Sequence, residues 1–309
     1  MSLATKLVMK KNNLKRYFSL AIITVVMSTF LYANVNKSIY GNDNRRLIRD
    51  LNSNNSVEHT YLNYSKAILA QIPTWRITEQ TKNSIIIETK TLKNGLKFCS
   101  DENFLDEPIV SSCTAFLVAP NLILTAGHCI KDKFDCKKNT WVLDYHNNDD
   151  NLYIDNKISF PKEKTFQCAE LITQAENQKV DYALIRLDRS IDDRPSLKIR
   201  KNGKTDSKEP LILLGHPLGM PLMVSDQIFI RDNSLENVFK TNADAFSGNS
   251  GSPLIGLNSG LVEGILIRGD DDFNLDAKEN CNKAVKCNDK ECRGETVLRS
   301  MHLPNKYIP

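Results

Sequence analysis

The chain lacks the features that would assign it to several large classes of protein. Aromatic residues make up only 7% of its 309 residues, and no basic cluster has aromatic side chains interleaved with it, so nothing argues for nucleic-acid binding. There is no internal repeat, and outside residues 62–70 no long stretch has helical periodicity. A hydrophobic content of 41% and a charged content of 25% are ordinary for a globular protein, which excludes disorder over the whole chain.

Acidic residues are missing from residues 1–33, which carry five basic ones. Removing these five from the 41 basic residues leaves 36 against 37 acidic, so the formal charge of +4 belongs to the leader. A basic stretch at residues 10–16 precedes an apolar run at residues 17–33 that ends in Ala33, a pattern typical of a secretory signal peptide. The alternative is an uncleaved membrane anchor, for which the run is slightly short. We expect cleavage, a secreted or periplasmic protein, and no membrane association after leader removal.

The cysteine content agrees with export. An even number of cysteines behind a signal-like leader predicts disulfides. The eight are Cys99, Cys113, Cys129, Cys136, Cys168, Cys281, Cys287 and Cys292. A zinc site built from the last three would lack close paired spacing and histidines, so we expect no metal. We expect instead that some of these three tie down the C-terminal segment.

The chain also lacks the serine motif of the α/β-hydrolases, although it has a serine between glycines. Residues 248–252 read Gly-Asn-Ser-Gly-Ser, so Ser252 stands where that motif needs its last glycine. That fold also places its histidine after the serine, and only His302 follows Ser250. The sequence therefore predicts another way of activating Ser250, because a serine hydroxyl is a poor nucleophile without a neighbouring base.

A histidine and a carboxylate suited to this task precede Ser250. His128 ends the segment 118–128, in which an apolar run is followed by Thr-Ala-Gly-His, and histidine can accept and return a proton near neutral pH. Asp181 stands directly before the apolar run 182–187 and can orient the imidazole. Nearby acidic alternatives are Asp188, Asp192 and Asp193. His216, in a turn-like Gly-His-Pro-Leu-Gly segment, is interpreted as structural.

These segments resemble the histidine and serine motifs of the trypsin/chymotrypsin superfamily, and residues 248–253 are most similar to its bacterial glutamyl-endopeptidase-like branch. The order histidine, aspartate, serine is also that of the superfamily. The resemblance covers roughly residues 75–275. It implies catalysis by His128, Asp181 and Ser250, with the backbone N–H groups of Gly248 and Ser250 forming an oxyanion hole.

The resemblance has two further implications. The 16-residue separation of Cys113 and Cys129 is similar to that of the superfamily's histidine-loop disulfide, whereas the other six cysteines allow 15 pairings. Asn249 stands where the animal digestive enzymes have the aspartate that pairs with a newly cut N-terminal amine, so activation by that ion pair is not expected.

For the substrate pocket, the residues give conflicting predictions. Asp244 lies six positions before Ser250, where trypsin-like enzymes place the aspartate that selects Arg or Lys. Arg268 lies in a segment that lines the pocket wall in the superfamily and could receive an acidic side chain. The two could also neutralise each other and leave a pocket for neutral side chains. The expectation is a preference for Arg or Lys, with the acidic and neutral options left open.

Short apolar runs separated by Asn, Asp, Gly and Pro predict an all-β protein. Together with the motif order they favour a chymotrypsin-like double β-barrel with the active site in the cleft between barrels. We expect a signal peptide at 1–33, an N-terminal arm or pro-segment at 34–74, a first barrel at 75–195, a second at 196–275 and a Cys-rich C-terminal segment at 276–309. An arm could be flexible, begin the mature chain near residue 40, or be cut near Arg45 and Arg46.

The function expected from this resemblance is that of a serine endopeptidase acting on protein or peptide substrates, without a metal or organic cofactor. The alternative is a catalytically silent protease-like domain that serves as a binding module. Retention of all three triad residues favours the enzyme. The sequence leaves the oligomeric state open.

Overall fold

The computed structural model describes residues 39–148, 151, 153–269 and 272–309. The chain divides into two compact units, residues 1–34 and 35–309, and every described residue belongs to the second. The predicted signal peptide lies outside the described residues. No helix in the described ranges is long and apolar enough to cross a membrane.

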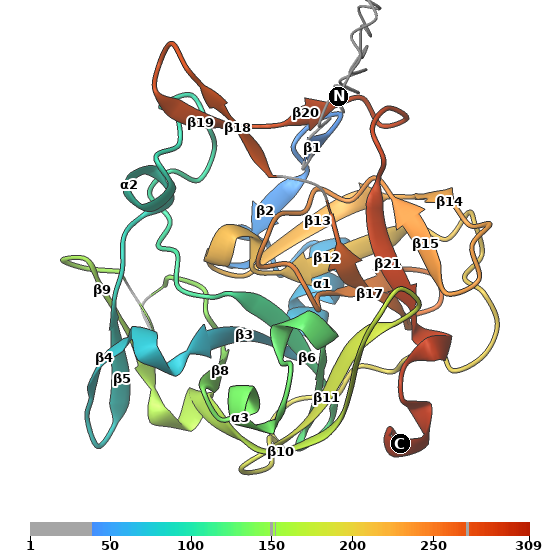
Figure 1. Cartoon of the computed structure of the whole chain (residues 1–309), viewed down its shortest axis with the longest axis horizontal. Coiled ribbons are helices and arrows are strands. Elements are labelled where there is room, and N and C mark those ends of the chain that lie inside the picture. The colour runs from blue at the N-terminus through green and yellow to red at the C-terminus, as the bar shows by residue number, and fades with distance from the viewer. Residues whose placement is uncertain (1–38, 149–150, 152, 270–271) are drawn as a thin grey trace, which may run out of the picture. The chain divides into compact units, whose positions relative to one another are not determined.

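Six antiparallel strands close into a barrel, in the order β10–β11–β7–β6–β3–β8, seen in the lower part of Figure 1. The strands are β3 (Ile68–Pro73), β6 (Cys113–Ala119), β7 (Leu122–Thr125), β8 (Asn139–Leu143), β10 (Thr165–Glu176) and β11 (Asp181–Leu187). Phe116 and Trp141 are completely buried in the hydrophobic core. Burial of such side chains stabilises the barrel by about 25 cal/mol for each Å² of apolar surface removed from water.

A second sheet has the strand order β14–β15–β21–β17–β16–β12–β13–β2. Its strands are β2 (Arg45–Leu47), β12 (Leu211–Gly215), β13 (Met223–Ile228), β14 (Ile230–Asp232), β15 (Val238–Thr241), β16 (Pro253–Gly256), β17 (Val262–Arg268) and β21 (Glu295–Arg299). Phe239, Leu254 and Val297 form part of a buried apolar cluster on this sheet. The sheet therefore joins strands from both ends of the described chain around the strands that flank Ser250.

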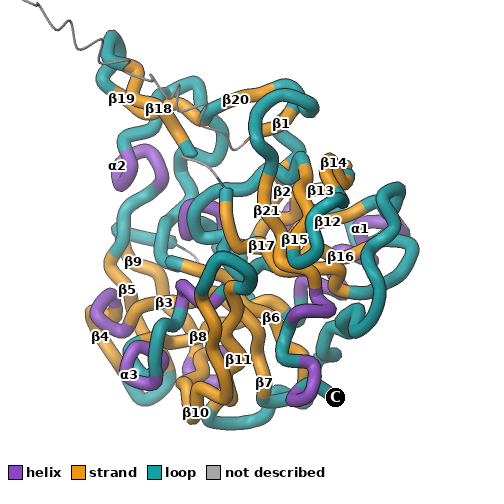
Figure 2. Tube along the Cα trace, turned by 45° about the vertical axis from the view of Figure 1, so that its right-hand side comes forward, coloured by secondary structure: helices purple, strands orange, loops and turns teal. Residues whose placement is uncertain are grey.

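The remaining elements are short, and Figure 2 shows how strands predominate over helices. Small sheets contain β1 (Ile39–Tyr40) with β20 (Lys286–Cys287), β18 (Phe273–Asp276) with β19 (Cys281–Ala284), and β4 (Ile77–Gln80), β5 (Ser84–Glu88) and β9 (Lys157–Pro161). The α-helices are α1 (Ser56–Ser65), α2 (Leu92–Leu96) and α3 (Lys133–Cys136). The 3₁₀ turns are η1 (Ile48–Asp50), η2 (Thr74–Arg76), η3 (Gly127–Cys129), η4 (Lys162–Lys164), η5 (Pro217–Gly219), η6 (Ser300–His302) and η7 (Asn305–Tyr307).

The all-β prediction is confirmed. A closed barrel carries the histidine and aspartate motifs, and a second sheet contains the strands on either side of the serine motif. Sheet membership differs from the expected boundaries because strand partners need not be close in sequence. The barrel includes β3, which precedes residue 75, and the second sheet includes β21, which follows residue 275. The segment 39–47 is not a flexible arm, because β2 pairs with β13 and the Arg45 side chain is buried against Asp43.

All eight cysteines are paired, as Cys99–Cys281, Cys113–Cys129, Cys136–Cys168 and Cys287–Cys292. The Cys113–Cys129 disulfide is the one that the resemblance implied. The expectation that C-terminal cysteines tie down their segment is confirmed by Cys99–Cys281, which joins residues 182 positions apart. Because thiolates are needed to bind zinc, the fully oxidised set contradicts the zinc alternative.

Candidate active site

His128 lies in the turn η3, directly after strand β7. The turn packs closely on the neighbouring hairpin of β10 and β11, because a Cβ on Gly127 would overlap the carbonyl oxygen of Ala175. Glycine is therefore required beside the histidine. Gln174 adds a hydrogen bond from its Nε2 to the Gly127 carbonyl at 3.2 Å. The local sequence fixes His128 on the edge of the barrel.

Strand register brings Asp181 to the same edge. Ala183 of β11 pairs with Thr125 of β7 in an antiparallel ladder. Because the strands are antiparallel, Asp181, two residues before Ala183, lies at the same end of the ladder as the His128 turn, which follows Thr125. The two functional side chains therefore meet although 53 positions separate them in sequence.

Two hydrogen bonds join His128 to Asp181. The backbone N–H of His128 donates to Asp181 Oδ1 at 3.0 Å, and Nδ1 lies 2.8 Å from Oδ2. Because a carboxylate can only accept, Nδ1 carries the proton in this contact and the neutral ring keeps Nε2 as an acceptor. The Asp181 side chain is 4% exposed and that of His128 is 31% exposed, so a buried carboxylate supports a solvent-accessible imidazole.

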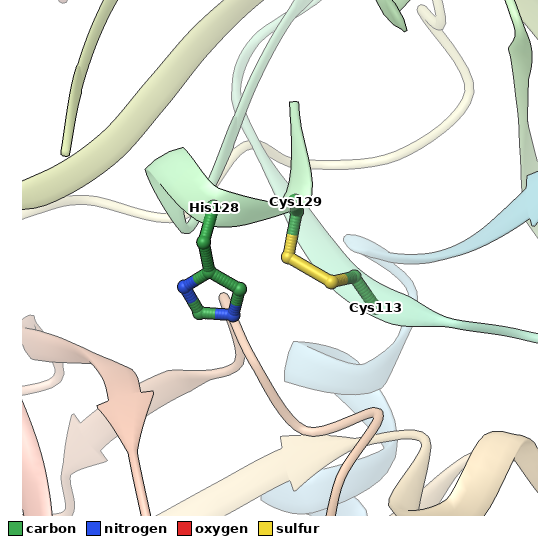
Figure 3. A group of neighbouring side chains, drawn as sticks. All are labelled: Cys113, His128 and Cys129. Atoms are coloured by element: carbon green, nitrogen blue, oxygen red, sulfur yellow. A yellow bond between two sulfur atoms is a disulfide. The ribbon is translucent and has the colours of Figure 1, made fainter. Parts of the chain in front are cut away.

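The His128 ring lies beside the Cys113–Cys129 disulfide (Figure 3). Ligand atoms of these three residues lie within 4.8 Å of one another, which is close enough for a shared metal ion. The two sulfur atoms are bonded to each other, however, and neither is a thiolate. The cluster is therefore a histidine next to a structural crosslink.

The loop that carries Ser250 is hydrogen-bonded to the barrel. The backbone N–H of Thr114 donates to the Ser250 carbonyl at 2.9 Å, and the Thr114 hydroxyl donates to the Gly248 carbonyl at 2.8 Å. Extending the β6–β7 register from Phe116 opposite Leu124 places Thr114 opposite Ala126, two residues before His128. The structure thus brings Ser250, His128 and Asp181 into one neighbourhood. Within the described residues both hydrogen bonds of His128 go to Asp181, and none joins it to Ser250.

Gly248 gives the serine loop its shape. Its φ is +95°, and a Cβ there would overlap the His216 carbonyl oxygen, so another residue would be strained and would clash. Over residues 39–309 with their short gaps, the N–H groups of Gly248 and Ser250 donate to no backbone carbonyl, whereas the Asn249 N–H donates to Phe246 at 2.9 Å. Two donors beside Ser250 are therefore available to a ligand.

A cavity of about 300 Å³ opens beside Ser250. Its lining includes Phe246, Ile267, Arg268, Asp272 and Glu295. Larger hollows elsewhere, such as one between β4, β5 and β10, contain none of the three predicted catalytic residues. Sequence reasoning missed Asp272 and Glu295. The sequence did contain a signal for Glu295, because this acidic residue stands directly before the short β-type run 296–298.

Asp244 is not among the residues that line this cavity. Its side chain is buried and turned toward the N-terminal segment, where Oδ1 accepts from the Tyr40 N–H at 2.6 Å and Oδ2 from the Asn44 N–H at 2.8 Å. Arg268 instead donates to the Asn177 carbonyl at 3.1 Å. The expected pocket floor at Asp244, and its pairing with Arg268, therefore disagree with the contacts. The carboxylate turns inward because two backbone donors satisfy it there.

His216 is structural, as interpreted from the sequence. It is 1% exposed, hydrogen-bonded through Nδ1 to the Met220 carbonyl at 3.0 Å, and stacked on Tyr145. Burial lowers its pKa to about 3, so the ring is neutral. Its carbonyl packs against Gly248, and it thereby supports the serine loop without reaching the cavity.

A family model for the trypsin-like peptidase domain matches residues 113–265, which include His128, Asp181 and Ser250. This chain contains a trypsin-like peptidase domain. It is a serine endopeptidase of the trypsin/chymotrypsin-like kind, as the two sequence motifs predicted. The match begins at the first cysteine of the Cys113–Cys129 disulfide and ends within β17 of the second sheet.

Solved structures similar to the peptidase are distant in sequence. A Glu endopeptidase in complex with MPD is 16% identical, with a TM-score of 0.48, and the alignment covers 87% of this chain and 96% of that one. The inactive form of a serine-to-alanine mutant of Rv3671c from M. tuberculosis H37Rv is 14% identical, with a TM-score of 0.42 and coverages of 80% and 88%. No curated protein matches the peptidase.

Proposed function

We propose that the protein is a secreted serine endopeptidase in which Ser250 is the nucleophile, His128 the general base and acid, and Asp181 the orienting carboxylate. The observation that carries this proposal is the pair of hydrogen bonds between His128 and Asp181 at the edge of the barrel. The loop that contains Ser250 is hydrogen-bonded to the same edge. This arrangement supplies a base next to a serine and fixes the tautomer of that base.

In the proposed reaction, His128 Nε2 accepts the hydroxyl proton while Ser250 Oγ attacks the carbonyl carbon of the scissile peptide bond. The imidazolium formed is stabilised by Asp181 and then gives its proton to the leaving amine, so that an acyl-enzyme remains. In the second half of the reaction, His128 takes a proton from water, the resulting hydroxide attacks the ester carbonyl, and His128 gives the proton to Ser250 Oγ as the carboxylic acid product leaves. No hydrogen bond joins Ser250 to His128 among the described residues, and contacts between a nucleophile and its base often tighten only when substrate binds.

The N–H groups of Gly248 and Ser250 are proposed as the oxyanion hole. Their lack of a described carbonyl partner supports this assignment, since a donor already used within the protein could not stabilise a new negative charge. Each such donor is typically worth about 2.7–4 kcal/mol of the activation barrier. Thr114 holds the loop in this conformation through its bond to the Gly248 carbonyl.

Strand β17 offers a backbone edge for an extended peptide. Its pairing with β16 runs only as far as Ile265, and Leu266 then bonds to residues of the serine loop. Residues Ile267 and Arg268 continue past that point along the cavity beside Ser250. Addition of a substrate strand to a free sheet edge is a common mode of peptide recognition and suits protein or peptide substrates.

Secretion is proposed from two features. The leader at residues 1–33 has the basic and then apolar pattern of a signal peptide. Four disulfides that use every cysteine are typical of proteins from oxidising compartments.

A fluorophosphonate probe tests the catalytic assignment, because it reacts covalently with an activated serine. We expect labelling at Ser250, located by mass spectrometry of the labelled peptide, and none in Ser250→Ala. The exposed Ser234, whose hydroxyl donates to Asp232, provides a matched control variant, Ser234→Ala, which should label normally. Absence of labelling in the folded wild type would favour the silent binding module.

A further inference from the structure

We propose that the second sheet carries a binding site for a phosphate or sulfate group, separate from the cavity beside Ser250. The site is a cavity of about 440 Å³ lined by strands β14 and β15 and by the chain around the Cys287–Cys292 disulfide. Strand β14 is an edge strand of the sheet and β15 is its neighbour (Figure 1). None of the three proposed catalytic residues lines this cavity, so the inference does not depend on the catalytic assignment.

The lining of this cavity has an excess of positive charge. Within the part of the chain that the structure describes, its charged lining residues are Arg231, Asp232, Lys240, Lys290 and Arg293. The cavity beside Ser250 has the opposite balance, with one guanidinium and two carboxylates. The excess does not reflect a basic protein, because residues 34–309 carry 36 basic residues (41 less the five of the leader) against 37 acidic ones. Like charges around one cavity repel one another, and an anion between them relieves that repulsion.

The single acid of the lining is engaged by its own turn. Asp232 Oδ1 accepts from the Ser234 N–H at 2.8 Å and from the Ser234 hydroxyl at 2.6 Å. Asp232 stands opposite Lys240 in the β14–β15 ladder, yet among the described residues no ion pair joins the two side chains. The carboxylate therefore offsets only part of the positive charge of the cavity.

Arg231 keeps its positive charge free of any acidic partner. Its Nη2 donates to the Cys292 carbonyl at 3.1 Å, and the guanidinium lies over the Tyr40 ring at 5.4 Å. Its Nη1 is buried and has no hydrogen-bond partner in the described ranges. Neither the carbonyl nor the ring carries a negative charge, so the protein positions this guanidinium without neutralising it.

Gly294 brings two of the basic residues together. Its φ is +80°, and a Cβ there would lie 2.9 Å from the Thr241 carbonyl oxygen. The same Cβ would lie 3.3 Å from Arg231 Nη1 and 3.5 Å from Lys240 Cβ. Glycine therefore allows Arg231 and Lys240 to approach one point of the backbone with no side chain between them.

The loop that carries Lys290 is fixed at several points. The Cys287–Cys292 disulfide closes it over a sequence separation of 5. Asn242 Nδ2 donates to Asp289 Oδ1 at 3.0 Å, and the Gly41 N–H donates to the Cys287 carbonyl at 2.7 Å. The acid of the loop is thus bonded to Asn242, whereas Lys290 lines the cavity. Binding groups on paired strands and a crosslinked loop lose little conformational freedom when a ligand binds.

A doubly charged tetrahedral oxyanion suits these groups. The planar N–H pairs of Arg match two oxygens of a phosphate or sulfate group, and the Lys ammonium groups add point charges. A singly charged carboxylate would offset less of the positive lining. The cavity has the volume of a small-molecule site, which leaves room for the molecule to which such a group is esterified. The group can therefore come from the free ion or from an ester, and the experiment separates these sources.

Isothermal titration calorimetry at low salt tests the site with two ligands, inorganic phosphate and a heparin-derived hexasaccharide that carries sulfate esters. The cavity variant is Lys240→Gln, Lys290→Gln, whose ammonium groups have no partner among the described residues, so the fold should persist. We expect the wild type to bind at least one ligand and the cavity variant to bind it roughly 10-fold more weakly. The control, Lys137→Gln, Lys138→Gln, makes the same charge change at exposed lysines after α3 and should bind like the wild type.

The outcomes separate the two sources of the anion from failure of the proposal. Binding of inorganic phosphate that weakens only in the cavity variant supports a site that the free ion can fill. Binding of the hexasaccharide alone, with the same selective loss, supports a sulfate ester. The proposal is wrong if neither ligand binds, or if the cavity and control variants lose affinity equally, because equal losses reflect net charge. Added NaCl should weaken specific binding, since the site is open to screening by salt.

A second measurement on the wild type covers a cavity variant that does not fold. Either ligand at millimolar concentration should raise the thermal midpoint above that in NaCl of equal ionic strength, because it binds the native state. The rise should saturate, whereas general stabilisation by excluded salts continues to grow with concentration. If neither ligand gives a saturable rise, the cavity is not an oxyanion site.

Discussion

The two halves of the candidate site are held in place by different kinds of interaction. In the closed barrel, His128 and Asp181 meet through the register of β7 and β11, and the disulfides Cys113–Cys129 and Cys136–Cys168 lie within the same residue range. In the second sheet, the surroundings of Ser250 are assembled from distant segments. The His128–Asp181 pair is thus a product of local strand pairing, whereas Ser250, the proposed nucleophile, and its cavity depend on both ends of the described chain.

The largest expected effect on this comparison is the loss of turnover when one functional group is removed from each half of the candidate site. Ser250→Ala and His128→Ala should each lower kcat by roughly 10⁶-fold, and the double variant should lose no more, because the residues act as a unit. Asp181→Asn should cost about 10⁴-fold, since it disturbs the orientation and tautomer of His128. Steady-state kinetics measure these losses, and thermal unfolding should show little change. Near-normal turnover of Ser250→Ala, or additive losses, would contradict the assignment.

Removing a disulfide should lower stability and activity more when the disulfide lies in the barrel, beside His128, than when it lies near the C-terminus. The Cys113→Ala, Cys129→Ala pair removes a crosslink with a sequence separation of 16, and should lower the free energy of unfolding by about 3 kcal/mol. It should also lower the activity of the folded enzyme, because this crosslink lies beside His128. The comparison is the Cys287→Ala, Cys292→Ala pair, with a separation of 5 and an expected cost of about 2 kcal/mol.

Urea unfolding and active-site titration of these two double variants supply the measurements. If both pairs reduce the activity per folded molecule equally, the local role of Cys113–Cys129 at the histidine turn is not supported.

The smallest expected effect concerns the link between Asp244 and the N-terminal segment. Burial raises the pKa of Asp244 from 3.8 to about 7. The folded protein then holds a proton that the unfolded chain releases near pH 4, so this stabilising contribution is present at low pH and is lost as the pH rises through 7. Asp244→Asn should therefore show a smaller fall in thermal midpoint between pH 5 and pH 8 than the wild type. Glu209→Gln, which changes another buried acid, serves as the control, and an unchanged fall in Asp244→Asn would contradict the assigned pKa.

The sequence predicted the barrel half better than the second sheet. Apolar runs at 114–118, 122–125 and 183–187 correspond to β6, β7 and β11, because strands buried on both faces leave a continuous apolar signal. Strand β10 has no such signal, because all of its residues from 169 onward are exposed or half-buried and little apolar pattern marks it. Its pairing comes from its neighbours β8 and β11 rather than from its own side chains.

The substrate cavity could not be assembled from sequence alone. Asp244 has the right spacing from Ser250, but two backbone N–H groups some 200 residues away turn its carboxylate inward. Glu295 lies 45 positions after Ser250, beyond the small β18–β19 sheet, and only the β17–β21 pairing brings it back. Contacts between such distant segments leave no periodic signal in either of them. The proposed catalytic residues, in contrast, lie in short motifs that a resemblance can identify.

The strand order has a consequence for the timing of folding. The barrel strands all lie between residues 68 and 187, so the barrel can close while the rest of the chain is still being made. The second sheet cannot be completed until β21 at residues 295–299 arrives, and the crosslink to Cys281 also waits for the C-terminal segment. The His128–Asp181 pair thus has all its parts early, while the cavity wall at Glu295 comes last. The order of synthesis itself delays completion of the candidate site until almost the whole chain has been made.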